Sequence, residues 1–121
     1  APFLISHYID WATTRDIDVS RYFNISVSSI ARAKITVFGK IGFVDLGFNP
    51  TSNITTSKLL ELPESLDIKP LYTTELCFTI GDEDSRRALV ERSSGHTYIS
   101  TSAHTSSANK FCRIFGMFFL Q

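Results

Sequence analysis

The last eleven residues of the chain, FCRIFGMFFLQ (111–121), constrain the fold more than any other stretch. With the two-residue period of a β-strand, one face carries Phe111, Arg113, Phe115, Met117 and Phe119, and the other carries Cys112, Ile114, Gly116, Phe118 and Leu120. Both faces are apolar from Ile114 onward, whereas a half-buried antiparallel strand has one apolar face and one polar face. A strand of this kind needs apolar neighbours on both sides.

Strand patterns continue through most of the chain, separated by turn residues. Each of the following segments has the pattern of a short strand: 22–28, 34–39, 40–48, 58–62, 71–80, 86–92 and 96–101. Their apolar faces are predicted to carry Phe23, Ile25 and Val27, then Val44, Leu46 and Phe48, then Tyr72, Leu76, Phe78 and Ile80. We therefore predict an all-β fold, an antiparallel β-sandwich or barrel of about seven or eight short strands. One segment, 28–33 (SSIARA), indicates a single helical turn capped by Ser28 or Ser29.

The length of 121 residues predicts a single domain. Within it, we expect residues 1–33 to be an N-terminal strand or loop region that leads into a β core formed by residues 34–121. The chain begins with Ala1 rather than Met, and we expect no secretory signal before the domain. We expect it to be a processed product or a piece of a longer protein.

Composition argues against several classes of function. Lys and Arg number 12, as do Asp and Glu, so the chain lacks the basic excess of a nucleic-acid-binding protein. No apolar run is long enough to span a membrane. Cys77 and Cys112 fall on different strand faces, which predicts free thiols. No Cys or His pair has the spacing of a metal site, and neither a metal nor a cofactor is predicted.

The sequence contains no catalytic motif. It has neither the G-x-S-x-G turn of a serine hydrolase nor a glycine-rich phosphate loop. The carboxylate pairs Asp16/Asp18 and Asp82/Asp84 could bind calcium or act as acid and base. Because Asp favours turns for local hydrogen-bonding reasons, we interpret both pairs as solvated turns. The chain is therefore predicted not to be an enzyme.

Binding residues are predicted in two places. Trp11, the sole tryptophan, could stack on a sugar ring, or could instead close one end of the barrel. If the last strands form a meander, the loops 81–85 and 102–109 fall at the same end. That arrangement would gather a polar cluster suited to a saccharide, made of Asp82, Arg86, His104 and Asn109.

The second apolar face of the final strand predicts an oligomer. Burial of Phe115, Met117 and Phe119 is worth about 1.5–3 kcal/mol for each side chain. Exposed apolar patches usually mark interfaces, so a further copy of the chain is the expected cover, with this face at or near the axis of a homotrimer. The alternative is that a helix or long loop from residues 1–20 covers the same face.

Four stretches of the chain resemble the C-terminal head domains of bacteriophage tail receptor-binding proteins. ITVFGKIGFVDLGF (35–48) is similar to the family's early strand pair, and LLELPESLDIKP (59–70) to its Leu-Pro-x-Gly-aromatic-Arg-Pro segment, with Leu62, Pro63, Lys69 and Pro70 in matching roles. SSGHTYIS (93–100) resembles its glycine turn, and RIFGMFFLQ (113–121) its closing strand. The chain departs from the family at Ser65 and Leu66, where Gly and an aromatic are expected, and by two extra residues before Lys69.

The resemblance implies a non-catalytic head domain of a homotrimer in the virion tail. Such heads bind host surface polysaccharide or teichoic-acid glycan, often where protomers meet, and join other tail proteins through an N-terminal region. Two alternatives stay open. One is an extracellular trimeric ligand of the tumour-necrosis-factor or complement type, and the other is a glycan-cleaving or deacetylating enzyme.

Overall fold

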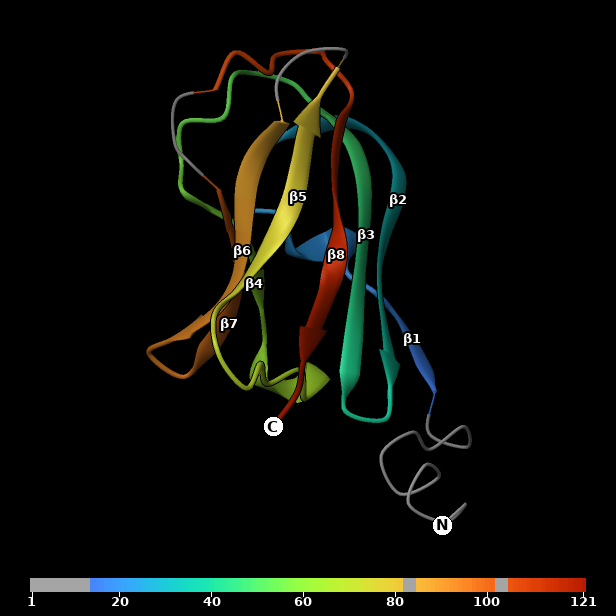
Figure 1. Ribbon diagram of the computed structural model, residues 1–121. Coiled ribbons are helices and arrows are strands. Elements are labelled where there is room, and N and C mark those ends of the chain that lie inside the picture. Colours follow the sequence, from blue (N-terminus) through green and yellow to red (C-terminus); the bar gives the residue numbers. More distant parts are fainter. Residues whose placement is uncertain (1–13, 82–84, 102–104) are drawn as a thin grey trace, which may run out of the picture.

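The computed structural model describes residues 14–81, 85–101 and 105–121, and these form one antiparallel β-sheet (Figure 1). Its eight strands are β1 (Arg15–Asp18), β2 (Val27–Phe38), β3 (Ile41–Pro50), β4 (Lys58–Leu62), β5 (Thr74–Ile80), β6 (Ser85–Ser93), β7 (His96–Thr101) and β8 (Cys112–Phe119). Two 3₁₀ turns, η2 (Ser20–Tyr22) and η3 (Glu64–Leu66), interrupt them. None of the described residues belongs to a helix long and apolar enough to cross a membrane. The predicted all-β, antiparallel class is confirmed.

The sheet curls into a half-barrel, and its strand order differs from the chain order. The order is β1-β2-β3-β8-β5-β6-β7-β4, so the last strand of the chain lies in the middle of the sheet between β3 and β5 (Figure 1). The two ends of the sheet approach each other where Phe23 bridges Leu60 of β4. Next to that bridge, the Asn24 amide donates a hydrogen bond to the Leu59 carbonyl at 2.8 Å.

The concave face of the sheet holds the hydrophobic core. Val44, Leu46 and Phe48 of β3 and Leu76, Phe78 and Ile80 of β5 are buried there, as their alternation predicted. β8 contributes Cys112, Ile114 and Phe118 to the same core. This face of β8 is apolar because it lines the concave core.

Two glycines permit close packing around β8. Gly42 pairs with Phe118 across β3 and β8, and a Cβ at Gly42 would lie 2.5 Å from Phe118 Cζ. Gly116 has φ +155°, and a Cβ there would lie 2.9 Å from Leu76 Cδ2. At both positions the missing side chain makes room for a neighbouring core side chain.

Three local expectations were wrong. Residues 28–33 form no helical turn but lie within β2, where pairing with β3 outweighs a weak local helical preference. The segment 22–28 is not a regular strand, because the chain crosses from η2 to the bridge with β4 before it enters β2 at Val27. Tyr72 precedes β5 and is exposed, so it does not belong to the apolar core face.

Candidate functional site

The convex face of β8 carries a stripe of exposed apolar side chains. Met117 is 48 % exposed and Phe119 is 41 % exposed, although both belong to a central strand. Phe115 on the same face is half-buried, and the Arg113 guanidinium lies over its ring at 4.3 Å from the centroid. The predicted interface residues therefore all point away from the core.

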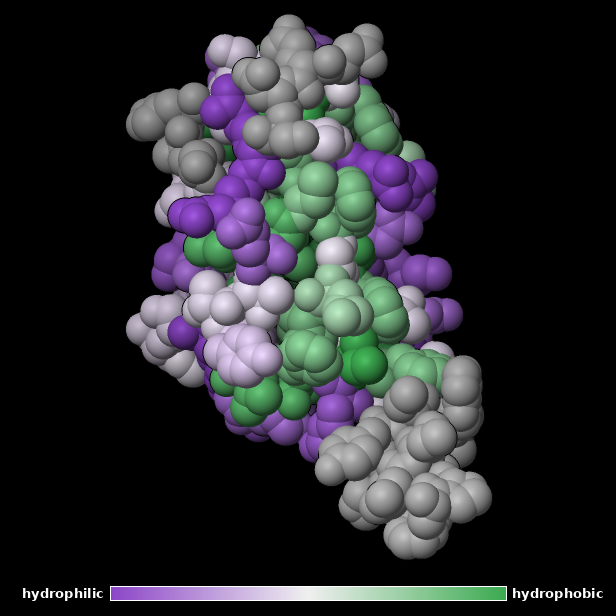
Figure 2. All heavy atoms as spheres, in the orientation of Figure 1, coloured by the Kyte–Doolittle hydropathy of each residue, from purple (hydrophilic) through white to green (hydrophobic). Residues whose placement is uncertain are grey.

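Side chains from distant segments widen this stripe. Phe43 of β3 pairs with Met117, and the Leu71 amide donates a hydrogen bond to the Phe119 carbonyl at 2.8 Å. The Tyr72 ring meets the Phe119 ring edge-on at 6.5 Å between centroids. Figure 2 shows the resulting apolar band along β8 and β3. We call it the β8 patch, made of Phe43, Leu71, Tyr72, Phe115, Met117 and Phe119.

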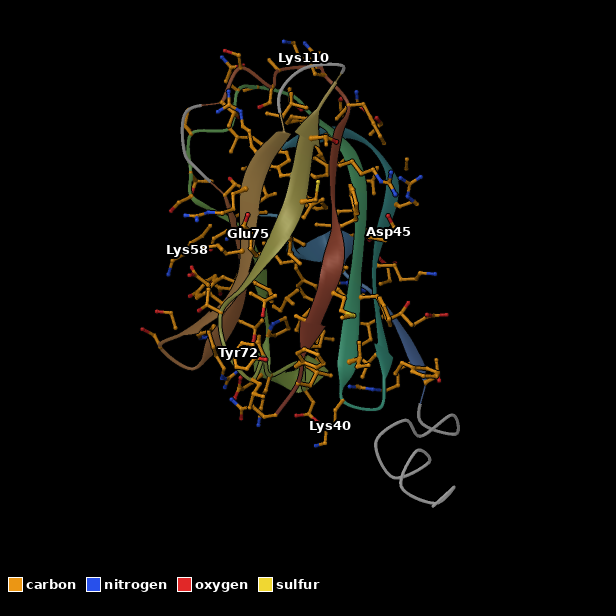
Figure 3. The ribbon with its side chains drawn as sticks, in the orientation of Figure 1. Lys40, Asp45, Lys58, Tyr72, Glu75 and Lys110 are labelled. Carbon is orange, nitrogen blue, oxygen red and sulfur yellow. The ribbon has the colours of Figure 1, made fainter. Side chains whose placement is uncertain are left out.

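Ion pairs border the β8 patch on two sides. On the β2 side, Arg32 Nε donates to Asp45 Oδ1 at 3.0 Å. On the β6 side, Arg87 Nη1 lies 3.8 Å from Glu75 Oε2. Asp45 and Glu75 are seen on opposite sides of β8 in Figure 3. Each border therefore carries one acidic and one basic side chain.

The described part of the N-terminal region does not cover the β8 patch. Residues 15–18 form β1, which pairs with β2 at the edge of the sheet. Val19 then enters the core, and η2 leads toward β4. The alternative cover, a segment of residues 1–20, therefore reduces to residues 1–13, which lie outside the described residues.

The predicted saccharide cluster is only partly described. Trp11, Asp82 and His104 lie outside the described residues. Arg86 is exposed in β6, and Asn109 is exposed in a turn with φ +59°. Their segments meet at one end of the barrel, where the Gly81 amide donates to the Phe111 carbonyl at 2.8 Å. Neither a hydrogen bond nor an ion pair joins Arg86 to Asn109.

A groove of about 560 Å³ lies next to the β2-side border of the patch, where β1 ends beside β2. After Asp18 the chain turns inward, and the Val19 amide donates to the Ala33 carbonyl at 2.9 Å. Within the described residues, no strand pairs with β2 on this side beyond Lys34, and the upper part of β2 is an open edge (Figure 1). We call this hollow the β1–β2 groove, lined by Asp16, Asp18, Ser20, Ile30, Ala31, Arg32, Ala33 and Lys34.

The carboxylates of the groove take part in local hydrogen bonds. Thr36 Oγ1 donates to Asp16 Oδ1 at 2.8 Å, and the Ser20 amide donates to Asp18 Oδ1 at 2.9 Å. The hydrogen bonds from Ser20 lower the pKa of Asp18 below its ordinary value. Both residues lie within β1, where Asp16 pairs with Thr36 and Asp18 pairs with Lys34, so the interpretation of this pair as a turn was wrong.

The cysteines are free and lie on different faces, as predicted. Cys112 is buried in the core, and burial raises the pKa of its thiol to about 11. Cys77 lies on the convex face opposite Phe115. No group of three or more His, Cys, Asp or Glu within the described ranges could hold a metal ion.

Sequence reasoning singled out Phe115, Met117 and Phe119 but missed the rest of the β8 patch and the β1–β2 groove. Phe43 could have been found, because it alternates with Val44 and must face away from the core. Leu71 and Tyr72 join the patch through a contact with the end of β8, for which no local signal exists. Comparison of the chain with protein families, curated proteins and solved structures finds no match.

Proposed function

We propose that this chain is the non-catalytic head domain of a homotrimeric receptor-binding protein, of the kind that bacteriophage tails use to attach to host cell-surface saccharide. The β8 patch carries this proposal, because it is an apolar surface that a second and a third copy of the chain would cover. An N-terminal continuation would connect the head to other tail proteins of the virion.

The size of the patch supports an interface. Its five exposed members are each 41–57 % exposed, which corresponds to about 500 Å² of apolar surface for side chains of about 200 Å². That area lies in the range of the largest patches on monomeric proteins, which are often functional. It supplies more than half of the roughly 800 Å² that each partner buries in a standard interface. The charged borders would supply the rest.

The shape and charge of the patch favour copies related by a threefold axis. The stripe is narrow, and Asp45 lies opposite Phe115 on one side of it. A face-to-face sheet dimer would take the Arg32–Asp45 ion pair out of water, and the desolvation of a charge pair is costly. Around a threefold axis the β8 stripes meet centrally. The acid of one border can then face the base of the other border on the next copy.

Binding without catalysis is supported by one carboxylate of the groove, that of Asp18. A glycan-cleaving enzyme needs a general acid whose pKa is raised. The pKa of Asp18 is shifted in the opposite direction, because its carboxylate accepts hydrogen bonds from Ser20.

Sedimentation velocity at micromolar concentration tests the assembly. We expect a trimer for the wild type and a monomer for Met117→Asp, because the substitution places a charge in a dry interface. Ile30→Asp is the matched control, since Ile30 is also an exposed apolar residue, 38 % exposed, but lies outside the patch. A monomeric wild type, or equal behaviour of the two variants, contradicts the proposed interface.

Incubation of the protein with cell-wall glycan tests the second half of the proposal. We expect bound glycan to be recovered unchanged in length and acetylation, as measured by chromatography and mass spectrometry. Released sugar or acetate would instead indicate the enzymatic alternative.

A further inference from the structure

The β1–β2 groove is a hollow of the described surface, and no part of the β8 patch occupies it. Its volume of about 560 Å³ falls within the usual range of about 300–1,000 Å³ for small-molecule sites. The groove exists because β1 is short. Once Val19 leaves for the core, the upper half of β2 has a solvent-exposed edge.

The groove offers both donors and acceptors that the fold leaves partly unused. Asp16 and Asp18 each have one carboxylate oxygen free of the hydrogen bonds described above. Lys34 is exposed, and its side chain forms neither a hydrogen bond nor an ion pair with the described residues. Carboxylates accept several hydrogen bonds and an ammonium donates three, so a ligand with many hydroxyl groups can satisfy both.

The groove has no excess of basic side chains. Its lining includes Asp16 and Asp18 on one hand and Arg32 and Lys34 on the other, and Arg32 is already paired with Asp45. A site for a phosphate polymer would instead present an excess of basic side chains. The lack of a basic excess favours an uncharged ligand over a phosphate polymer.

The floor of the groove is apolar and shallow. Ala31 and Ala33 have small side chains, and Ile30 adds exposed apolar surface beside them. Sugar rings present apolar CH faces between their hydroxyls, which such a floor can contact. Addition of a peptide strand to the open edge is less well matched, because β2 is irregular at Val27/Ser29 and at Ile30/Arg32.

We propose that the β1–β2 groove binds a short, uncharged oligosaccharide, with Asp16, Asp18 and Lys34 as its hydrogen-bonding groups. This inference rests on the function proposed above and assigns it a site and a ligand class. Asp16 and Asp18 lie on β1, one strand further from β8 than the Arg32–Asp45 border, so the site stays accessible at the rim of the trimer.

Three variants in the assembled protein test the site. Ala31→Trp fills the groove from an exposed position. Asp16→Asn and Lys34→Gln each remove one charged partner and change the net charge in opposite directions. Glu61→Gln and Lys58→Gln make the same charge changes on β4, at the other end of the sheet order. Thermal unfolding and sedimentation check that each variant keeps its fold and assembly.

The probes are an array of neutral oligosaccharides of glucose, galactose, rhamnose and N-acetylglucosamine, and poly(glycerol phosphate) as the polyanion. We expect the wild type to bind a neutral oligosaccharide, Ala31→Trp to lose binding by at least about tenfold, and each charge variant to lose about three- to tenfold. The β4 controls should bind as the wild type does.

Each other outcome overturns a specific step. If the wild type binds glycan and Ala31→Trp binds equally well, the groove is not the site, and the proposed function stands. If Ala31→Trp does not fold, the two charge variants decide. Should Asp16→Asn and Lys34→Gln both bind glycan as well as the wild type does, the groove is not the site. Opposite changes in these two variants, or preferred binding of poly(glycerol phosphate), contradict an uncharged ligand. A wild type that binds no probe overturns the proposed function itself.

Discussion

Gly42→Ala is the substitution whose effect the structure defines most sharply. The added Cβ would lie 2.5, 2.6 and 3.1 Å from Phe118 Cζ, Cε1 and Cε2. Carbon atoms in ordinary contact are about 3.5–4.0 Å apart, and the ring would therefore have to move by about 1 Å. Phe118 is fully buried among other core side chains and has no free space to enter. We expect a loss of about 2–3 kcal/mol in the free energy of unfolding.

The magnitude can be checked by calorimetry and by denaturant unfolding at a fixed protein concentration, since assembly also contributes to stability. For a domain of this length, the loss corresponds to a fall of about 8–12 °C in Tm. Gly47→Ala is the matched control. Its Cβ would lie 2.9 Å from Phe111 Cζ, but Phe111 is 40 % exposed and its ring can swing into solvent. We expect Gly47→Ala to cost less than about 1 kcal/mol.

A double-mutant cycle isolates the contact. Phe118→Leu removes the ring atoms nearest to Gly42 and should itself cost about 1–2 kcal/mol. In that background Gly42→Ala should be neutral or slightly stabilising, because Ala loses less backbone entropy than Gly on folding. If Gly42→Ala costs the same with and without the Phe118 ring, the close approach of ring and backbone does not determine the stability of this region.

Three further predictions concern other parts of the molecule. Gly116→Ala should lower the free energy of unfolding by about 1–3 kcal/mol, because φ is +155° and the added Cβ would meet Leu76. An unchanged denaturation midpoint would contradict this expectation. In the dissociated Met117→Asp variant, iodoacetamide at pH 8 should alkylate Cys77 and spare Cys112, whose thiol is buried and has its pKa raised to about 11. Mass spectrometry of the protein labelled without denaturant measures the order, and faster alkylation of Cys112 contradicts this expectation. Glu64 accepts hydrogen bonds from Arg92 at 2.8 and 3.0 Å, which lower its pKa below the ordinary value of 4.5. Its contribution to stability is therefore present above pH 4.5 and is lost as the pH falls through the lowered folded-state pKa. Glu64→Gln should flatten the stability profile on the acid side of pH 4.5, and parallel profiles for the two proteins would rule out this linkage.

Much of the fold could be predicted from local patterns. Val44, Leu46 and Phe48 alternate strictly with their neighbours. In a strand that buries one face, these three side chains must therefore all lie on the buried face. Leu76, Phe78 and Ile80 follow the same rule. These segments predict strands because the two-residue period of the side chains is a property of the extended backbone itself.

Local patterns failed where tertiary contacts outweighed a weak preference. Residues 28–33 could form a helical turn on their own, but one turn without a buried face has little stability. Pairing with β3 gives the same residues a ladder of hydrogen bonds and places them in β2. The groove beside them depends on where β1 ends and Val19 turns inward, which no pattern in the sequence indicates.

The sequence by itself determined that the final strand has two apolar faces, and it indicated that Phe115, Met117 and Phe119 share the outer one. Only the tertiary structure decided which strands lie beside β8. Because β8 inserts between β3 and β5, its register with those strands turns Phe118 toward Gly42 and the core, and turns Met117 outward beside Phe43. The partners of β8 come from segments far away in the chain. Such pairings depend on how the whole sheet curls, and a short sequence window holds no information about them.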